Sequence, residues 1–90
     1  MNIKINEIVN KNKISKISNA VNIFNKMMSE YKKNNDISKF ILDFEEMEQC
    51  TIFIFKEIIR QMQLKLNGNF GLEIINAKPL IVQQFNLALR

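Results

Sequence analysis

The chain has 90 residues, 47% of them hydrophobic, and a net charge of +4. Length and apolar content predict one folded domain over residues 1–90 and exclude a disordered chain. The sequence has no histidine, the usual general base and the commonest metal ligand, and its single cysteine, Cys50, excludes an internal disulfide. No apolar run approaches the roughly 20 residues of a membrane span, so we expect a cytoplasmic protein without a membrane partner.

The charge is distributed unevenly along the chain. Residues 1–39 hold eight lysines and three acidic residues (+5), whereas residues 40–90 hold five basic and six acidic residues (−1). A basic half is compatible with a nucleic-acid partner. The lysines are dispersed among asparagines, however, so we favour a solvated lysine face. Nucleic-acid binding through the lysine-rich N-terminal half stays an alternative.

The first half of the chain is predicted to form a strand, a helix and a second strand. In residues 3–9, Ile3 and Ile5 alternate with polar residues, as in a half-buried strand. Residues 38–44 are almost continuously apolar, as in a strand that is covered on both faces. Between them, apolar residues at steps of three and four predict a helix over 16–33 whose buried stripe is Ile17, Val21, Phe24, Met28 and Tyr31.

Residues 51–75 allow two interpretations. Helical spacing predicts a helix over 51–66, ended by Gly68 in a left-handed conformation, and then a strand over 70–75. Alternatively, branched and aromatic residues at 52–55 favour a strand, and Asn67-Gly68 favours a hairpin within 62–74. We favour the helix, because its apolar stripe covers three turns and comprises Phe55, Ile58, Ile59, Met62 and Leu66.

A last helix is predicted over 78–89. Asn76 can cap it, and Pro79 suits its first turn because a missing N–H costs nothing there. Its expected buried stripe is Ile81, Phe85, Ala88 and Leu89. The alternation of strands and helices predicts an α/β fold, in which about three helices cover a small, mostly parallel sheet in the order β-α-β-α-β-α.

The junction between the second strand and the second helix concentrates polar residues. Four acidic residues occur within six positions, and Cys50 and Thr51 follow: Asp43, Glu45, Glu46 and Glu48. Several oxygens could hold a hard cation, but consecutive loop acids point in different directions, which favours a solvated loop. Cys50 lacks a histidine partner, and no glycine-rich phosphate loop is present. The sequence therefore predicts no enzyme, no cofactor and no metal site.

We expect Asp43 to be structural, accepting backbone N–H bonds that shape the turn toward Cys50. Thr51 is predicted to cap the second helix. The run Ile52-Phe53-Ile54 is more apolar than one helix face needs, so part of it is predicted to be exposed, and exposed apolar surface of this kind usually marks an interface.

The succession of these motifs resembles a STAS domain, and more closely the small bacterial STAS-like proteins. The resemblance rests on Leu42-Asp43-Phe44, the acidic turn Glu45-Glu46-Met47, the helix start at Cys50-Thr51, the acid Glu57 one turn later, and the stretch "FGLEIINAKPLIVQQFNLAL". It covers roughly residues 38–90, and the N-terminal strand and helix more loosely. It implies the STAS fold and a regulatory module that binds a protein.

In anti-sigma-factor antagonists of this family, a partner docks around the loop and helix after the strand and phosphorylates a serine at the helix start. Here no serine occupies that stretch, and Thr51 is the nearest hydroxyl. The resemblance therefore implies partner docking without implying the phosphorylation switch. The expected docking residues are Glu45, Glu46, Glu48, Thr51, Phe53 and Glu57.

A second class of function also suits the chain. A small inhibitor, encoded by a mobile element against a host or defence protein, would equally be a short single domain without catalytic residues. The sequence does not identify the partner, and it leaves self-association into a homo-oligomer open.

Overall fold

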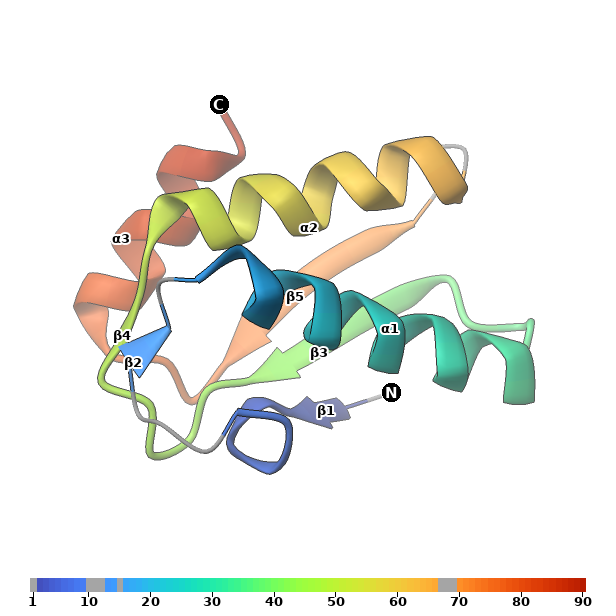
Figure 1. Cartoon of the computed structure of the whole chain (residues 1–90), viewed down its shortest axis with the longest axis horizontal. Coiled ribbons are helices and arrows are strands. Elements are labelled where there is room, and N and C mark those ends of the chain that lie inside the picture. The colour runs from blue at the N-terminus through green and yellow to red at the C-terminus, as the bar shows by residue number, and fades with distance from the viewer. Residues whose placement is uncertain (1, 10–12, 15, 67–69) are drawn as a thin grey trace.

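The computed structural model describes residues 2–9, 13–14, 16–66 and 70–90, in which strands and helices alternate (Figure 1). The elements are β1 (Asn2–Lys4), the 3-10 helix η1 (Ile5–Glu7), β2 (Lys13–Ile14), α1 (Ile17–Lys33), β3 (Lys39–Asp43), β4 (Gln49–Cys50), α2 (Ile52–Lys65), β5 (Gly71–Ile75) and α3 (Pro79–Ala88). The predicted α/β class, with a small parallel sheet and three helices, is confirmed.

Strands β1, β3 and β5 form one parallel sheet with β3 in the middle. The register places Ile3 beside Leu42 and Leu42 beside Ile74. Because parallel strands need crossover connections, α1 joins β1 to β3 and α2 joins β3 to β5. The carboxyl ends of the strands therefore lie at one end of the sheet, and the three helices begin at that end (Figure 1).

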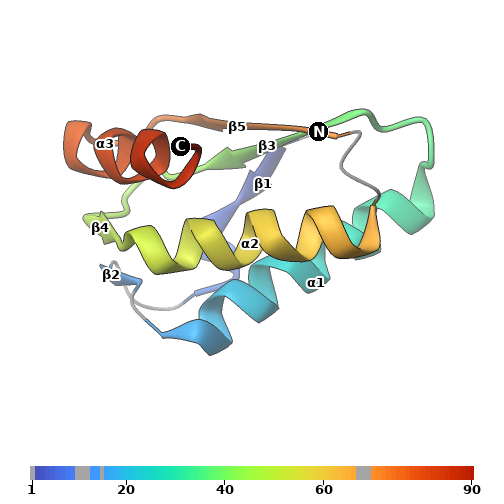
Figure 2. The ribbon, with the colours of Figure 1, turned by 90° about the horizontal axis from the view of Figure 1, so that it is seen from above.

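Helices α1 and α2 lie side by side over one face of the sheet (Figure 2). Phe40 and Leu42 of β3 point into this layer and are fully buried. On the opposite face Lys39 is exposed and Ile41 is half-buried, and no helix of the described residues lies over them. The prediction that β3 is covered on both faces is wrong. Helix α3 packs against α2 instead of over the open face of the sheet, and the ring centroids of Phe55 and Phe85 lie 5.2 Å apart.

Helix α1 begins one residue later than predicted and ends at Lys33 as predicted, but it is rotated relative to the predicted stripe. Its buried residues are Ala20, Ile23, Phe24 and Met27. Ile17 and Val21, which were expected inside, are 52% and 43% exposed. Both sets of residues have helical spacing and share Phe24, so periodicity alone did not distinguish them. The apolar residues at the start of α1 are consequently on the surface.

The first strand is shorter than the predicted span of 3–9. Strand β1 ends at Lys4, and the chain then turns through η1, which buries Ile5. Two further strands, β2 and β4, were not predicted, and they pair in parallel through Ile14 and Cys50. The pair continues into α2, because the Thr51 N–H donates to the Ile14 carbonyl at 3.1 Å.

The contested segment is helix followed by strand. Helix α2 covers residues 52–65, and β5 runs parallel to β3, so the hairpin alternative is wrong. The predicted left-handed cap at Gly68 lies outside the described residues. Helix α3 begins at Pro79 as expected, but Lys78 is its N-cap residue, and Asn76 turns away toward Asp43. Leu89 is 56% exposed, so it does not belong to the buried stripe.

Candidate functional site

The polar junction forms a tight turn followed by the short strand β4. The Met47 N–H donates to the Phe44 carbonyl at 3.0 Å, and both side chains are buried. Buried residues at both ends of the turn leave Glu45 and Glu46 exposed. Glu46 has a φ of 69°, a left-handed conformation that normally favours glycine or asparagine. Figure 1 shows this turn below β4 at the end of the molecule where α2 and α3 begin.

Asp43 lies beneath the turn and is only 6% exposed. Its Oδ1 atom accepts a hydrogen bond from the Glu45 N–H at 3.0 Å and another from Asn76 Nδ2 at 3.1 Å. Asn76 follows β5 and has a φ of 55°. The Asp43 carboxylate therefore links the segment that follows β3 to the segment that follows β5.

The loop acids diverge from one another. Asn6 Nδ2 donates to Glu46 Oε2 at 3.2 Å, whereas Lys78 Nζ contacts both carboxylate oxygens of Glu48 at 2.6 Å. Within the described ranges, no group of three potential ligands among Asp, Glu and Cys could hold a metal ion. Glu48 is neutralised by its salt bridge, so Glu45 and Glu46 carry the free negative charge of the loop.

Thr51 occupies the N-cap position of α2, but its hydroxyl makes no cap hydrogen bond. Oγ1 is buried and has no hydrogen-bond partner among the described atoms. The prediction of a side-chain cap is therefore wrong, although Thr51 does stand at the helix start. A kinase could reach this hydroxyl only after the segment opens locally, since the atom is shielded from solvent.

Cys50 precedes Thr51 and is fully buried. Burial raises the pKa of the thiol from its ordinary value of 9.0 to about 12, because the thiolate would lose its hydration. A thiol that stays protonated at neutral pH is a poor nucleophile. We therefore interpret Cys50 as a residue through which β4 packs against the core.

We expect Ellman's reagent to label Cys50 at pH 8 on the order of 100-fold more slowly in the folded protein than in denaturant. Equal labelling rates in both states would contradict the buried placement.

The raised pKa of the Cys50 thiol also makes the free energy of unfolding depend on pH. The stabilising contribution of the neutral thiol is complete below pH 9 and is lost as the pH rises toward 12. Unfolding curves should therefore show wild type losing stability relative to Cys50→Ala above about pH 9.

The first turn of α2 exposes one aromatic side chain. Ile54 is fully buried and Ile52 is half-buried, whereas Phe53 is 67% exposed. One turn further, Glu57 accepts hydrogen bonds from Arg60 at 2.7 Å and Gln61 at 3.0 Å. The Arg60 bond, followed by the Gln61 bond, lowers the pKa of the Glu57 carboxyl. Glu57 is thus already engaged within its own helix.

The structure brings the predicted docking residues to one end of the molecule, but they do not form a single cluster. Glu45 and Glu46 lie in the turn, Phe53 lies at the start of α2, and β4 runs between them (Figure 1). We call Glu45, Glu46 and Phe53 the junction surface. Sequence reasoning missed Ile17 and Val21, whose exposure could have been inferred only from the rotation of α1.

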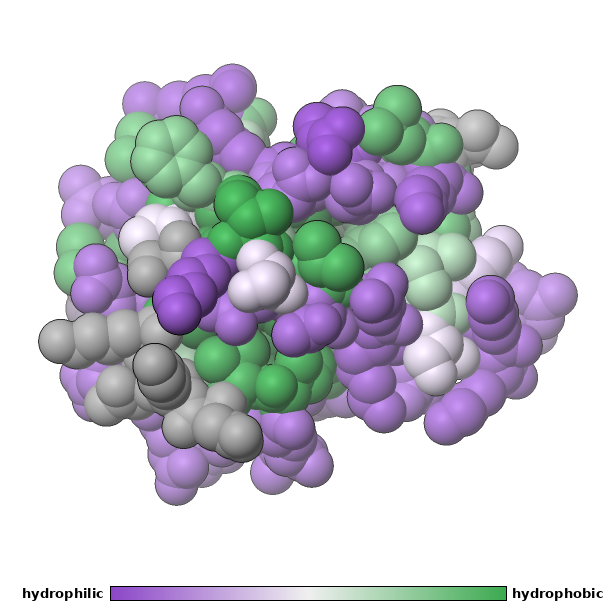
Figure 3. Space-filling view, in the orientation of Figure 1, coloured by the Kyte–Doolittle hydropathy of each residue, from purple (hydrophilic) through white to green (hydrophobic). Residues whose placement is uncertain are grey.

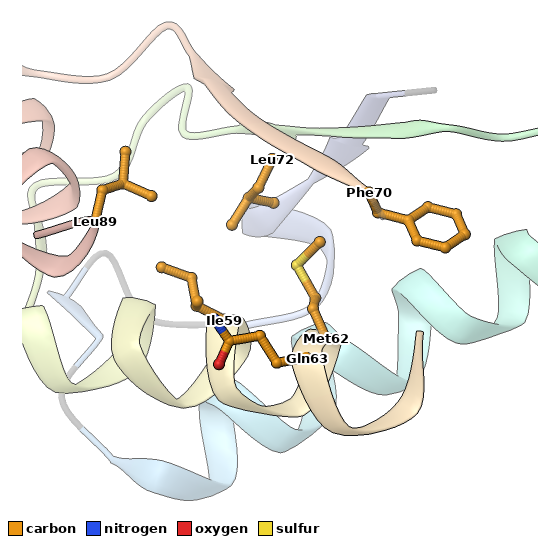
Figure 4. A pocket seen from close by; sticks show the side chains of 6 residues that line it. All are labelled: Ile59, Met62, Gln63, Phe70, Leu72 and Leu89. Carbon is orange, nitrogen blue, oxygen red and sulfur yellow. The ribbon is translucent and has the colours of Figure 1, made fainter. Parts of the chain in front are cut away.

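One hollow lies apart from this surface, between α2, β5 and the end of α3 (Figure 4). It has a volume of about 150 Å³ and is lined by Ile59, Met62, Gln63, Phe70, Leu72 and Leu89. Small-molecule sites usually measure roughly 300–1,000 Å³ and contain several polar groups. Gln63 is the one polar side chain in this lining, and no lining residue is ionisable, so the hollow offers no catalytic chemistry.

Comparisons of the chain with protein-family models, with curated proteins and with solved structures gave no match. The STAS resemblance consequently stays a prediction. None of the helices in the described residues is long and apolar enough to cross a membrane.

Proposed function

We propose that the chain is a non-catalytic regulatory module of the cytoplasm that docks a protein partner through the junction surface. The observation that carries this proposal is the 67% exposure of Phe53 at the start of α2. An aromatic side chain in water forgoes the free energy of burial, and aromatic residues are enriched among the anchors of protein interfaces. A partner that covers Phe53 would recover this free energy.

The two free carboxylates of the turn would add specificity to this anchor. Glu45 and Glu46 are exposed, and the turn that holds them lies at the end of the molecule where α2 begins with Phe53 in its first turn (Figure 1). Charges at the rim of an interface raise the association rate and select the sign of the partner's charge more than they raise affinity. The partner's surface opposite the turn is therefore expected to be basic. The STAS resemblance supports the same location, because family members dock partners around this loop and helix.

The absence of catalysis is part of the proposal. The sequence contains no histidine, and the one thiol is buried with a raised pKa. Asp43 is committed to hydrogen bonds with Glu45 and Asn76, and Glu57 to bonds with its own helix. Because these groups are buried or already hydrogen-bonded, we propose a role in binding and not in catalysis.

The proposal is tested by affinity capture from the native host, followed by mass spectrometry and binding kinetics with the captured protein. Reversing both turn charges (Glu45→Lys with Glu46→Lys) should slow association about tenfold at low salt, and less at high salt, because salt screens the steering field. The matched control is Asp36→Lys with Glu73→Lys, which makes the same charge change at two exposed acids outside the turn. Glu73 lies on the open sheet face and forms an exposed salt bridge with Lys39 at 3.0 Å.

The control should leave the association rate unchanged to within about twofold. Equal effects of the two changes would indicate a general charge effect and would remove the acidic turn from the interface. A partner that binds the turn variant and Phe53→Ala as tightly as wild type would refute the proposed surface altogether.

A further inference from the structure

Three exposed apolar side chains lie at neighbouring positions of α1 and α2. Phe53 is 67%, Ile17 52% and Val21 43% exposed. Ile17 and Val21 are one turn apart on α1, and Phe53 is in the first turn of α2. Hydrophobic surface gathers across the N-terminal ends of these two helices in Figure 3. We call these three residues the apolar row.

The β2–β4 pair explains why the starts of α1 and α2 lie beside each other. Ile14 pairs with Cys50, and Ile17 and Phe53 each follow their pairing residue by three positions. The Thr51 N–H bond to the Ile14 carbonyl fixes the two helix starts beside each other. Helices α1 and α2 then continue side by side (Figure 2), so one helix of a partner could contact apolar side chains of both.

Two lysines flank the row, one at each helix, whereas the acidic turn of Glu45 and Glu46 is separated from Phe53 by β4. Lys16 precedes Ile17 and Lys56 lies one turn after Phe53; both are exposed, and in the described part of the chain neither forms a salt bridge. The nearby acid, Glu57, is paired with Arg60 at 2.7 Å.

The helix starts add positive potential to that of the two lysines. Neither α1 nor α2 has an acidic residue in its first turn, and neither N-cap residue, Lys16 or Thr51, makes a side-chain cap bond within the described structure. Each N-terminus therefore presents about half a positive charge.

We infer that the apolar row binds an acidic amphipathic helix of the protein partner. This inference rests on the proposed function and extends the docking surface from α2 onto α1. Apolar residues of the bound helix, spaced by three and four, would cover Ile17, Val21 and Phe53, while its carboxylates would face Lys16, Lys56 and the helix starts. A second copy of this chain is disfavoured at the row, since a two-fold axis there would bring its lysines together.

The test is a selection of displayed random peptides of about 15 residues, long enough for about four helical turns, against the folded protein. Peptides that bind should be acidic and should carry apolar residues at helical spacing. The double change Ile17→Ser with Val21→Ser should weaken their binding about tenfold, as loss of interface anchors does. Lys16→Glu with Lys56→Glu should weaken it similarly.

The matched control is Lys32→Glu with Lys65→Glu, which makes the same charge change at the far ends of the same helices. It should alter binding by no more than about twofold. Selected peptides that are basic, no selected peptides at all, or insensitivity to the Ile17 and Val21 changes would overturn the inference. Binding of wild type to anionic phospholipid vesicles, lost in Lys16→Glu with Lys56→Glu, would overturn it in favour of a membrane surface.

The inference and the proposed function fail in different ways. If the captured partner depends on Phe53 and the acidic turn but not on Ile17 and Val21, the inference falls and the proposed function stands. If the captured partner is indifferent to Phe53, the proposed function falls, whatever the peptides show.

Discussion

Replacing Asp43 with alanine is expected to lower the free energy of unfolding by about 2–4 kcal/mol. The carboxylate is 6% exposed and accepts hydrogen bonds from the Glu45 N–H and from Asn76 Nδ2. A hydrogen bond to a charged group contributes roughly 1.5–3 kcal/mol, and alanine would leave both donors without this acceptor. For a domain of this size the melting temperature should fall by roughly 8–32 °C, which thermal unfolding followed by circular dichroism can measure.

The control for this prediction is Asp43→Asn. Asparagine keeps an oxygen at the same position, so both bonds can form, but it lacks the charge that strengthens them. Its loss of stability should therefore lie between wild type and Asp43→Ala. If Asp43→Ala is as stable as wild type but no longer binds its partner, Asp43 acts by direct contact, and the structural role is wrong.

Much of the fold could be predicted because its signals are local. Apolar spacing in residues 51–66 identified α2, and Pro79 identified the start of α3. The strand over 70–75 became β5 for the same reason, since alternation and flanking helices favour a parallel crossover. These patterns depend on a few neighbouring residues and do not require knowledge of the tertiary contacts.

Other features could not be predicted because they depend on contacts between distant segments. The β2–β4 pair is two residues long on each side, too short to leave a periodic pattern. Asn76 was expected to cap α3, but Asp43, distant in sequence, provides a better partner for its amide. Thr51 likewise has the residue type of a cap, yet its hydroxyl is turned into the protein without a bond in the described structure.

The candidate site also combines features that local sequence predicts with features that depend on tertiary contacts. Three consecutive apolar residues at a helix start cannot all face the core, so the exposure of one of them followed from the sequence, and it is Phe53. The neighbouring Ile17 and Val21 were missed because two stripes on α1 have equally good spacing. Packing buries Ala20, Ile23 and Met27, and this choice depends on how α1 lies against α2 and the sheet.

Replacing Phe53 with alanine is expected to speed dissociation of the partner and to weaken binding by about 1–3 kcal/mol, roughly 5–150-fold in Kd. Folding should barely change, because the side chain is 67% exposed and gives little to the core. The association rate should also stay close to that of wild type, since an apolar anchor acts mainly after encounter.

The measurement that tests the docking surface most directly is the Kd of the captured partner for two variants, Phe53→Ala and Leu64→Ala. Leu64 is 64% exposed and lies near the other end of the same helix, so it matches Phe53 in exposure but not in location. The junction surface predicts that Phe53→Ala raises Kd at least about fivefold while Leu64→Ala changes it by less than about twofold. Equal Kd values for wild type and Phe53→Ala, or a larger effect of Leu64→Ala, would contradict it.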